Sequence, residues 1–326
     1  MDVLVLLASL TIVTLGAEAL VRGASMLALR AGVSALFVGL TVVGFGTSSP
    51  ELAASLTATL RGSSDVSVGN VVGSNIFNIG VILGVTALLQ PIRVSLRAIR
   101  RDLLVAMAAA TVPLLSLLMG GRLSRGAGLF LVSTLVMYLG VAYRSARKAT
   151  REERELALSE VESTLAVDPS SGRLRDRPWV SMALVTLGLI MLVIGSRYFV
   201  GSAMDLAKTM GVSDLVIGLT VVSAGTSLPE LVTSLVAAKR RNPDIAIGTV
   251  IGSNIFNVLG ILGTCALVEP QAVSRQIVLL DTPIMCLATL ALIPIMKSGG
   301  VVSRKEGVLL VVGYVAYVAV IMIRGS

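Results

Sequence analysis

The sequence predicts an all-α membrane protein with ten transmembrane helices, arranged as two inverted repeats of five helices each. Composition is the first observation behind this fold class. Of the 326 residues, 55% are hydrophobic and 14% are charged, and the mean hydropathy is +0.90. The second observation is a series of apolar runs long enough to cross about 30 Å of hydrocarbon as helices. The third is a 46-residue segment of the first half that recurs in the second half.

The apolar runs place ten spans along the chain. Strands are not expected, because barrel strands alternate apolar and polar residues and these runs do not. The first run is expected to be a retained helix and not a cleaved signal peptide, because no basic residue precedes it and residues 182–200 match it internally. The expected spans are residues 3–20, 35–60, 66–89, 102–119, 127–143, 180–200, 214–238, 245–267, 277–296 and 307–323.

The repeated segments are residues 39–84 and 218–263, which share 27 of 46 residues at a constant offset of 179. Each half holds five expected spans, so the second copy enters the membrane from the opposite side. This inverted arrangement is typical of secondary transporters, whose substrate sites lie near the midplane at the repeat interface. We therefore expect two five-helix repeats, residues 1–143 and 179–326, joined by a charged linker at 144–178.

Lysine and arginine are distributed unevenly between the two faces that ten spans define. Twenty of the 27 fall on loops of one face, and the linker at 144–178 is one of these loops. Cytoplasmic loops carry the excess of basic residues, so this face is expected to be cytoplasmic and both termini outside. The net charge of +8 follows from this bias and does not indicate nucleic-acid binding. We expect an integral multi-pass protein of the cell (inner) membrane.

Each repeat contains a broken-helix pattern with one carboxylate. In the first repeat, Thr47 and Glu51 are four residues apart and therefore share a helix face. Pro50 has no N–H, so the carbonyl of Gly46 is expected to lose its helical partner and stay free. A carboxylate is costly at mid-membrane depth, so an intramembrane glutamate indicates a functional site. The second repeat has the same pattern in Thr226, Ser227, Pro229 and Glu230.

The next helix of each repeat adds hydroxyl and amide groups at four-residue spacing. These groups belong to Ser74 and Asn78, and to Ser253 and Asn257. Asn75 and Asn254 fall off this face and are expected to hydrogen-bond between helices instead. With the glutamates, the set is all-oxygen and partly anionic, which suits a hard cation such as Ca²⁺ better than a soft metal.

The motif pairs GTSSPEL with GSNIFN, and GTSLPEL with GSNIFN, resemble the two α-repeats of the sodium/calcium exchanger family of cation/calcium antiporters. The resemblance covers nearly the whole chain. It implies a secondary active antiporter that exchanges cytoplasmic Ca²⁺ for external Na⁺ by alternating access. Matched residue by residue, the family's cation ligands fall on Thr47, Ser48, Glu51, Ser74, Asn78, Thr226, Ser227, Glu230, Ser253 and Asn257, and on the carbonyls of Gly44 and Ser223.

The chain departs from part of this family at Asn257, where archaeal and potassium-dependent members have Asp. The missing carboxylate favours exchange without K⁺ co-transport.

The sequence also raises three alternatives to Na⁺-coupled exchange. A H⁺/Ca²⁺ exchanger on the same scaffold would use Glu51 and Glu230 as proton carriers. The sequence distinguishes poorly between this function and Na⁺/Ca²⁺ exchange. A cation channel is less expected, because channels usually form a ring of chains and this chain carries its own pseudo-symmetry. An enzyme is not expected: with no histidine in the chain, a Ser–His or Cys–His dyad is impossible.

No cofactor beyond the transported ions, no nucleic acid and no obligatory protein partner are expected. The expected partners are Ca²⁺, Na⁺ and the bilayer.

Overall fold

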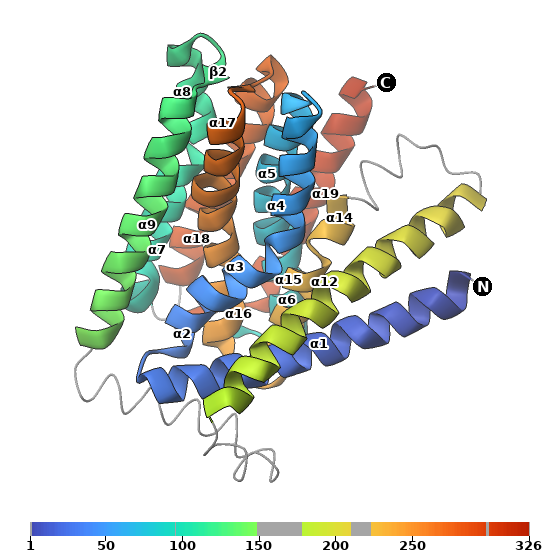
Figure 1. Cartoon of the computed structure of the whole chain (residues 1–326), viewed down its shortest axis with the longest axis vertical. Coiled ribbons are helices and arrows are strands. Elements are labelled where there is room, and N and C mark those ends of the chain that lie inside the picture. The colour runs from blue at the N-terminus through green and yellow to red at the C-terminus, as the bar shows by residue number, and fades with distance from the viewer. Residues whose placement is uncertain (1, 95, 149–177, 210–222, 298–299, 326) are drawn as a thin grey trace. The chain divides into compact units, whose positions relative to one another are not determined.

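The structure is a computed structural model of the 326-residue chain, and it describes residues 2–94, 96–148, 178–209, 223–297 and 300–325. The described part is almost entirely helical (Figure 1). Several helices contain a π-helical segment, in which the backbone hydrogen bonds span five residues instead of four.

The helices of the first half are α1 (Asp2–Ala31), α2 (Ala35–Val38), η1 (Gly39–Val43), α3 (Gly44–Thr47), α4 (Ser49–Leu60), α5 (Ser64–Phe77), η2 (Asn78–Leu83), α6 (Gly84–Leu89), α7 (Leu96–Ala110), α8 (Val112–Leu115), η3 (Ser116–Met119) and α9 (Arg125–Lys148). Those of the second half are α12 (Pro178–Thr209), α14 (Ser223–Thr226), α15 (Leu228–Lys239), α16 (Pro243–Ile255), η5 (Phe256–Leu262), α17 (Gly263–Val268), η6 (Ile277–Asp281), α18 (Thr282–Lys297) and α19 (Arg304–Gly325). The short strands are β1 (Ile92–Arg93), β2 (Arg122–Leu123), β3 (Gln271–Ala272) and β4 (Val301–Val302).

Eight helical segments of the described residues are long and apolar enough to cross a membrane. A ninth is added if Ala35–Thr47 and Ser49–Leu60 form one broken span. The protein is therefore a multi-pass helical membrane protein. The expected span at 214–238 includes residues outside the described part of the chain, and so does most of the expected linker at 144–178. The ten-helix count stays a prediction.

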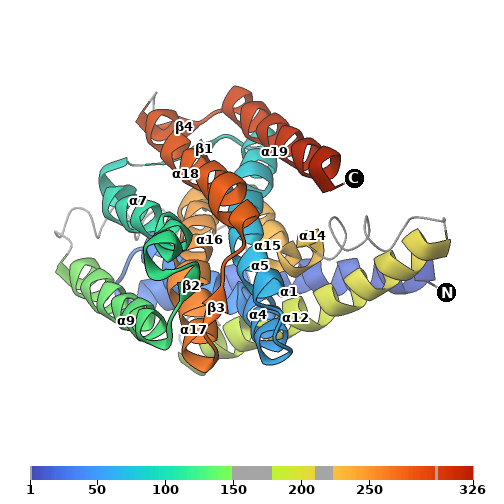
Figure 2. The same ribbon diagram turned by 90° about the horizontal axis from the view of Figure 1, so that it is seen from above.

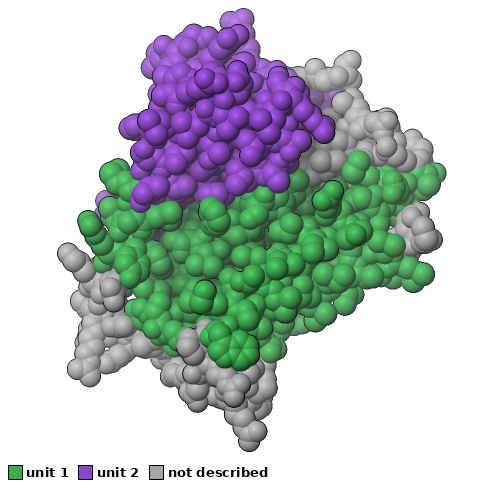
Figure 3. All heavy atoms as spheres, in the orientation of Figure 1, with its two compact units in different colours: residues 1–50, 137–252 green, residues 51–136, 253–326 purple. Residues whose placement is uncertain are grey.

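The chain forms two compact units, which Figure 3 shows in different colours. The first comprises Met1–Pro50 and Met137–Gly252, and the second comprises Glu51–Val136 and Ser253–Ser326. Each unit contains segments from both halves of the sequence. The chain passes from one unit to the other inside both repeat motifs, between Pro50 and Glu51 and between Gly252 and Ser253.

In the first unit, α1 and α12 lie side by side and run antiparallel (Figures 1 and 2). Gly16, Gly23, Gly188 and Gly195 lie at their interface, where a Cβ built on Gly188 would stand 2.6 Å from the backbone nitrogen of Leu20. Small residues at such an interface let transmembrane helices approach closely. The two helices have 30 and 32 residues, longer than the spans expected at 3–20 and 180–200. Hydropathy falls where polar residues begin, but the two helices extend beyond that point because they pack against each other.

The same unit packs α16 closely against the η1 segment. A Cβ on Gly252 would stand 2.3 Å from the carbonyl oxygen of Leu40, and one on Gly248 would stand 2.9 Å from that of Leu36. Buried apolar side chains from α1, α12, α15 and α16 complete the core, among them Val13, Leu20, Val185, Leu192, Val232 and Ile245.

In the second unit, α5 packs against η5 and α18, and α19 packs against η2 and α6. Two antiparallel ribbons join the loops: Ile92 pairs with Val302, and Leu123 pairs with Gln271. Adding 179 to residue 92 gives 271, and subtracting 179 from residue 302 gives 123. The β1–β4 pairing therefore maps onto the β3–β2 pairing, so this unit obeys the internal symmetry of the sequence.

Candidate cation-binding site

Both repeat motifs break their helices at the same place. Ser48 alone separates α3 from α4, at φ −80° and ψ 9°. Ser227 alone separates α14 from α15, at φ −88° and ψ 10°. Pro50 and Pro229 follow in the first turn of the next helix, where a missing N–H is tolerated. The predicted helix break is confirmed in both repeats.

The backbone carbonyls at the first break are bonded within the motif. The carbonyl of Gly46 accepts a hydrogen bond from Oγ of Ser49 at 2.7 Å. The carbonyl of Gly44 accepts from the N–H of Ser48 at 3.2 Å and from Oγ1 of Thr47 at 3.4 Å. The prediction of a free carbonyl at Gly46 is wrong, because the neighbouring hydroxyl replaces the donor that the proline removes.

In the first unit, Ser48 of the first repeat meets Glu230 of the second. Oγ of Ser48 donates to Oε1 of Glu230 at 2.9 Å. The glutamate is 1% exposed, and the side chains of Thr47, Ser48 and Ser227 are fully buried. Thr226 is half-buried, and only the backbone of Ser223 is described, as the first residue of α14. A carboxylate and several hydroxyls from both repeats thus lie in the interior of this unit.

In the second unit, Glu51 is also 1% exposed, as are Asn78 and Asn257. The hydroxyl residues Ser74 and Ser253 are buried as well. Oδ1 of Asn78 and Oδ1 of Asn257 are buried and have no hydrogen-bond partner among the residues that the structure describes. Two amide oxygens with open lone pairs are suited to bind a cation.

Asn75 and Asn254 hydrogen-bond between helices, as predicted. Nδ2 of Asn75 donates to the backbone oxygen of Asn254 at 3.2 Å, and Nδ2 of Asn254 donates to the backbone oxygen of Asn75 at 3.3 Å. Their own Oδ1 atoms accept from Nδ2 of Asn257 and of Asn78, at 3.0 and 2.9 Å. These last two bonds could not be predicted from the sequence, because helix-face spacing does not show which residues meet across helices.

Asn70 and Ser55 form a further polar contact beside the site that was not predicted from the sequence. Nδ2 of Asn70 on α5 donates to the backbone oxygen of Glu51 at 3.3 Å and to Oγ of Ser55 at 2.9 Å. These bonds hold α5 against the α4 helix at the level of the glutamate. Polar residues inside an apolar span were the available signal for this contact.

The twelve predicted ligands are divided between the two units. Those of the first unit are Gly44, Thr47, Ser48, Ser223, Thr226, Ser227 and Glu230; those of the second are Glu51, Ser74, Asn78, Ser253 and Asn257. Each unit therefore contains one of the two glutamates and groups from both repeats. A single site formed by all twelve residues stays a prediction.

These groups are oxygen donors of the kind that hard cations prefer. Each set combines one carboxylate with neutral oxygen donors, which is the kind of ligand set that Ca²⁺ accepts. In the described ranges, no group of three or more His, Cys, Asp or Glu side chains is placed to hold a metal ion.

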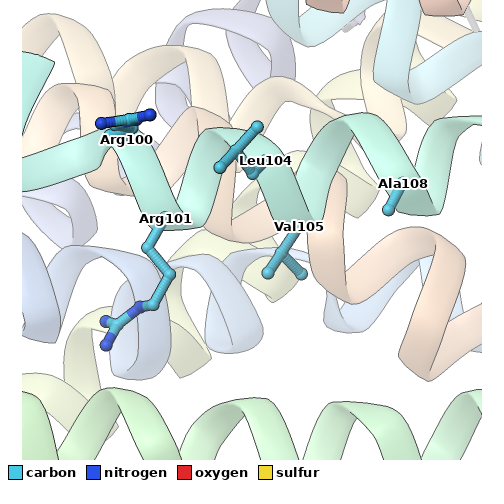
Figure 4. A pocket seen from close by; sticks show the side chains of 5 residues that line it. All are labelled: Arg100, Arg101, Leu104, Val105 and Ala108. Atoms are coloured by element: carbon cyan, nitrogen blue, oxygen red, sulfur yellow. The ribbon is translucent and has the colours of Figure 1, made fainter.

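A groove on α7 contains none of the predicted ligands. Figure 4 shows its lining, formed by Arg100, Arg101, Leu104, Val105 and Ala108. Nη2 of Arg101 pairs with Oδ1 of the buried Asp102 at 3.4 Å. The two arginines repel cations, so this groove is not part of the candidate site.

Known proteins resemble this chain over nearly its whole length. The inner membrane protein YrbG of Escherichia coli is 36% identical, over 97% of this chain and 95% of its own. The sodium/calcium exchanger MaX1 of Methanosarcina acetivorans is 34% identical, over 98% of this chain and 97% of its own. A solved structure of the sodium-calcium exchanger NCX_Mj, soaked with zero Na⁺ and Ca²⁺, matches with a TM-score of 0.81 and 28% identity, over 98% of both chains. The family model described as sodium/calcium exchanger protein matches residues 1–144 and 180–323. On this evidence the chain belongs to the sodium/calcium exchanger family.

Proposed function

We propose that this protein, a cation/calcium antiporter by family, exchanges Ca²⁺ for Na⁺ across the membrane by alternating access. The observation that carries this proposal is the pair of glutamates, Glu51 and Glu230, each 1% exposed at repeat-related positions beside hydroxyl and amide groups. A buried carboxylate is costly without a compensating cation. The symmetric placement of two such groups supports a cation site that both repeats build.

The proposed ligands are the twelve residues divided between the two units. Ca²⁺ takes six to eight oxygen ligands, and the two carboxylates balance the charge of one Ca²⁺. Two Na⁺ would be balanced equally well. Hydroxyl groups such as those of Ser48 and Thr47 can bind Na⁺ but carry no proton to exchange near neutral pH. This favours Na⁺ over H⁺ as the coupling ion.

The proposed architecture is ten helices in two inverted repeats of five, residues 1–143 and 179–326. The symmetric β-ribbons and the four reciprocal asparagine bonds support this arrangement. Inverted repeats that exchange conformations produce two access states around one site. The charge bias of the loops supports a cytoplasmic linker at 144–178, with both termini outside the cell membrane.

The proposal is tested by uptake of ⁴⁵Ca²⁺ into proteoliposomes that contain the purified protein. An outward Na⁺ gradient is expected to drive uptake, and a pH gradient of equal size is not. Replacing K⁺ by choline on both sides is expected to leave the flux unchanged, because Asn257 provides no third carboxylate. Uptake driven by the pH gradient alone would identify a H⁺/Ca²⁺ exchanger instead. Flux that collapses in choline and returns with K⁺ would overturn the prediction drawn from Asn257.

A further inference from the structure

We propose that Asn75 and Asn254 are positioning residues of the cation site. Each holds the side-chain amide of a ligand on the opposite repeat, so that the amide oxygen of this ligand is presented to the cation. The proposal rests on the proposed function, because it assigns a role within the same site. It adds two residues that the ligand set does not contain, and it states which ligand each of them controls.

The four asparagines of the second unit form a closed, reciprocal network. Nδ2 of Asn257 donates to Oδ1 of Asn75 at 3.0 Å, and Nδ2 of Asn78 donates to Oδ1 of Asn254 at 2.9 Å. Each of the two acceptor residues is itself fixed, since its Nδ2 donates to the other's backbone oxygen at 3.2 or 3.3 Å. Every bond of the network joins one repeat to the other.

This network determines which way the ligand amides face. A carboxamide has its oxygen and its nitrogen on opposite sides of one carbon atom, so fixing the nitrogen also fixes the oxygen. The side-chain oxygens of Asn75 and Asn254 are acceptors, and they can bond only to the NH₂ end of the amide that approaches them. Asn78 and Asn257 therefore turn their Oδ1 atoms away from the network.

The two Oδ1 atoms that the network turns outward are the open ones. Among the described residues they accept no hydrogen bond, although Asn78 and Asn257 are 1% exposed. A buried polar atom without a partner is unfavourable and needs an explanation. Two such atoms at repeat-related positions, in a chain of this family, are explained by a cation that they bind.

The backbone at the network is also irregular in both repeats. The π-helical segment η2 begins at Asn78, and η5 begins at Phe256, the residue before Asn257. π-helical turns occur frequently at functional sites. The network thus lies where each helix leaves the regular α-helical hydrogen-bond pattern.

A purely structural role for Asn75 makes a different prediction from a positioning role. If Asn75 only joins two helices, its loss should weaken the fold and leave the cation affinity unchanged. If it positions a ligand, its effect on affinity should depend on Asn257, to which it bonds, and not on Asn78, its neighbour on the same helix. The two roles can therefore be separated by double-mutant cycles.

The test uses the full-length protein in detergent and measures its melting temperature as Ca²⁺ is increased. The Ca²⁺-dependent rise in melting temperature gives the Kd, also for weakly binding variants, and the value without Ca²⁺ reports the stability of the fold. The variants are Asn75→Leu, Asn257→Ala, Asn78→Ala and the two double variants that contain Asn75→Leu. Asn254→Leu is measured in the same way, with the roles of Asn78 and Asn257 exchanged.

We expect Asn75→Leu to raise the Kd for Ca²⁺ by about tenfold alone and again by about tenfold in the Asn78→Ala background. In the Asn257→Ala background we expect it to raise the Kd by less than about twofold, because the ligand that it positions is already absent. Asn242→Leu is the matched control. This variant removes a buried bond between helices, from Nδ2 of Asn242 to Oγ of Ser25 at 3.2 Å, and should lower the melting temperature without changing the Kd.

Equal effects of Asn75→Leu in the two alanine backgrounds would overturn the proposal, as would an unchanged Kd with a lowered melting temperature. An unchanged Kd in Asn257→Ala would also overturn it, because there would be no ligand to position. Failure of the proposed function gives a separate result: the wild-type protein itself would show no Ca²⁺-dependent rise in melting temperature.

Discussion

At the scale of single residues, Glu51 and Glu230 provide the charge of the proposed site. Each is the carboxylate of its motif, and each is 1% exposed. A glutamine has nearly the same shape but no charge, so it leaves the transported cation less well balanced. We expect Glu51→Gln and Glu230→Gln each to lower Na⁺-driven Ca²⁺ uptake by at least about a hundredfold, which corresponds to roughly 2.7 kcal/mol.

The measurement for these two variants is ⁴⁵Ca²⁺ flux in proteoliposomes, with the melting temperature as the control for folding. Flux close to that of the wild-type protein in either variant would remove that glutamate from the mechanism. A loss of flux together with a loss of folded protein would call for the more conservative change to Asp.

Residue patterns predicted which polar groups of the motifs are buried better than they predicted the contacts of these groups. The two glutamates and the helix-joining role of Asn75 followed from polar groups in apolar sequence. The bond from Ser49 to the carbonyl of Gly46 did not, because the proline rule states which donor is lost and not which donor replaces it. The bonds of Asn78 and Asn257 depend on how two distant segments pack.

At the scale of elements, an ion pair joins α1 to the residue that follows α15. Nε of Arg240 donates to Oε2 of Glu18 at 2.8 Å, and a second bond joins Nη2 of Arg240 to Oε1 of Glu18. Burial disfavours the charged guanidinium of Arg240 and lowers its pKa from the ordinary value. The carboxylate of Glu18 offsets this effect by stabilising the charge. The positions related by the offset of 179 carry Arg197 and Arg61, two cations that cannot form this pair. The ion pair therefore has no counterpart at the positions related by the offset.

We expect Glu18→Gln and Arg240→Gln each to lower the melting temperature, and the double variant to lower it by less than the sum. The coupling free energy should be about 1 kcal/mol, because the pair is only partly exposed. The control is Glu269→Gln, which removes the pair of Glu269 with Arg125 at 3.3 Å on the exposed surface and should change nothing measurable. Additive effects of the two single variants would show that the residues act independently.

The positions of most described helices followed from hydropathy, but the helix lengths did not. The helix α1 continues beyond residue 20 through Arg22 to Ala31, where the apolar run has ended. The close contact of Gly23 with α12 and the hydrogen bond from Nη1 of Arg30 to Oγ of Ser181 at 3.2 Å stabilise this polar part. Hydropathy measures transfer into lipid, and it does not include the packing of one helix on another.

At the scale of the whole molecule, the internal symmetry was visible in the sequence and the division into units was not. The offset of 179 relates the two β-ribbons and the four asparagines residue by residue. The compact units, however, each combine segments of both repeats. Sequence similarity shows which segments share an ancestor, whereas packing depends on which segments meet in space.

The orientation in the membrane is a prediction for the whole molecule. Twenty of the 27 Lys and Arg fall on one predicted face, so the loop at 144–178 should be cytoplasmic. In a background without Cys265 and Cys286, a cysteine placed at Ser159 should not react with a membrane-impermeant maleimide added to intact cells. It should react after the cells are lysed. Labelling of intact cells would reverse the proposed topology.

In the proposed function, a Na⁺ gradient drives Ca²⁺ against its own gradient. The most direct test begins with proteoliposomes that hold the same Ca²⁺ concentration inside and outside, traced with ⁴⁵Ca²⁺. When an outward Na⁺ gradient is then imposed, we expect Ca²⁺ to accumulate inside above the external concentration and to leave again when the gradient is dissipated. Internal Ca²⁺ that stays at the external concentration, while ⁴⁵Ca²⁺ still equilibrates through the protein, would show that Ca²⁺ movement is not coupled to Na⁺ and would contradict Na⁺/Ca²⁺ exchange.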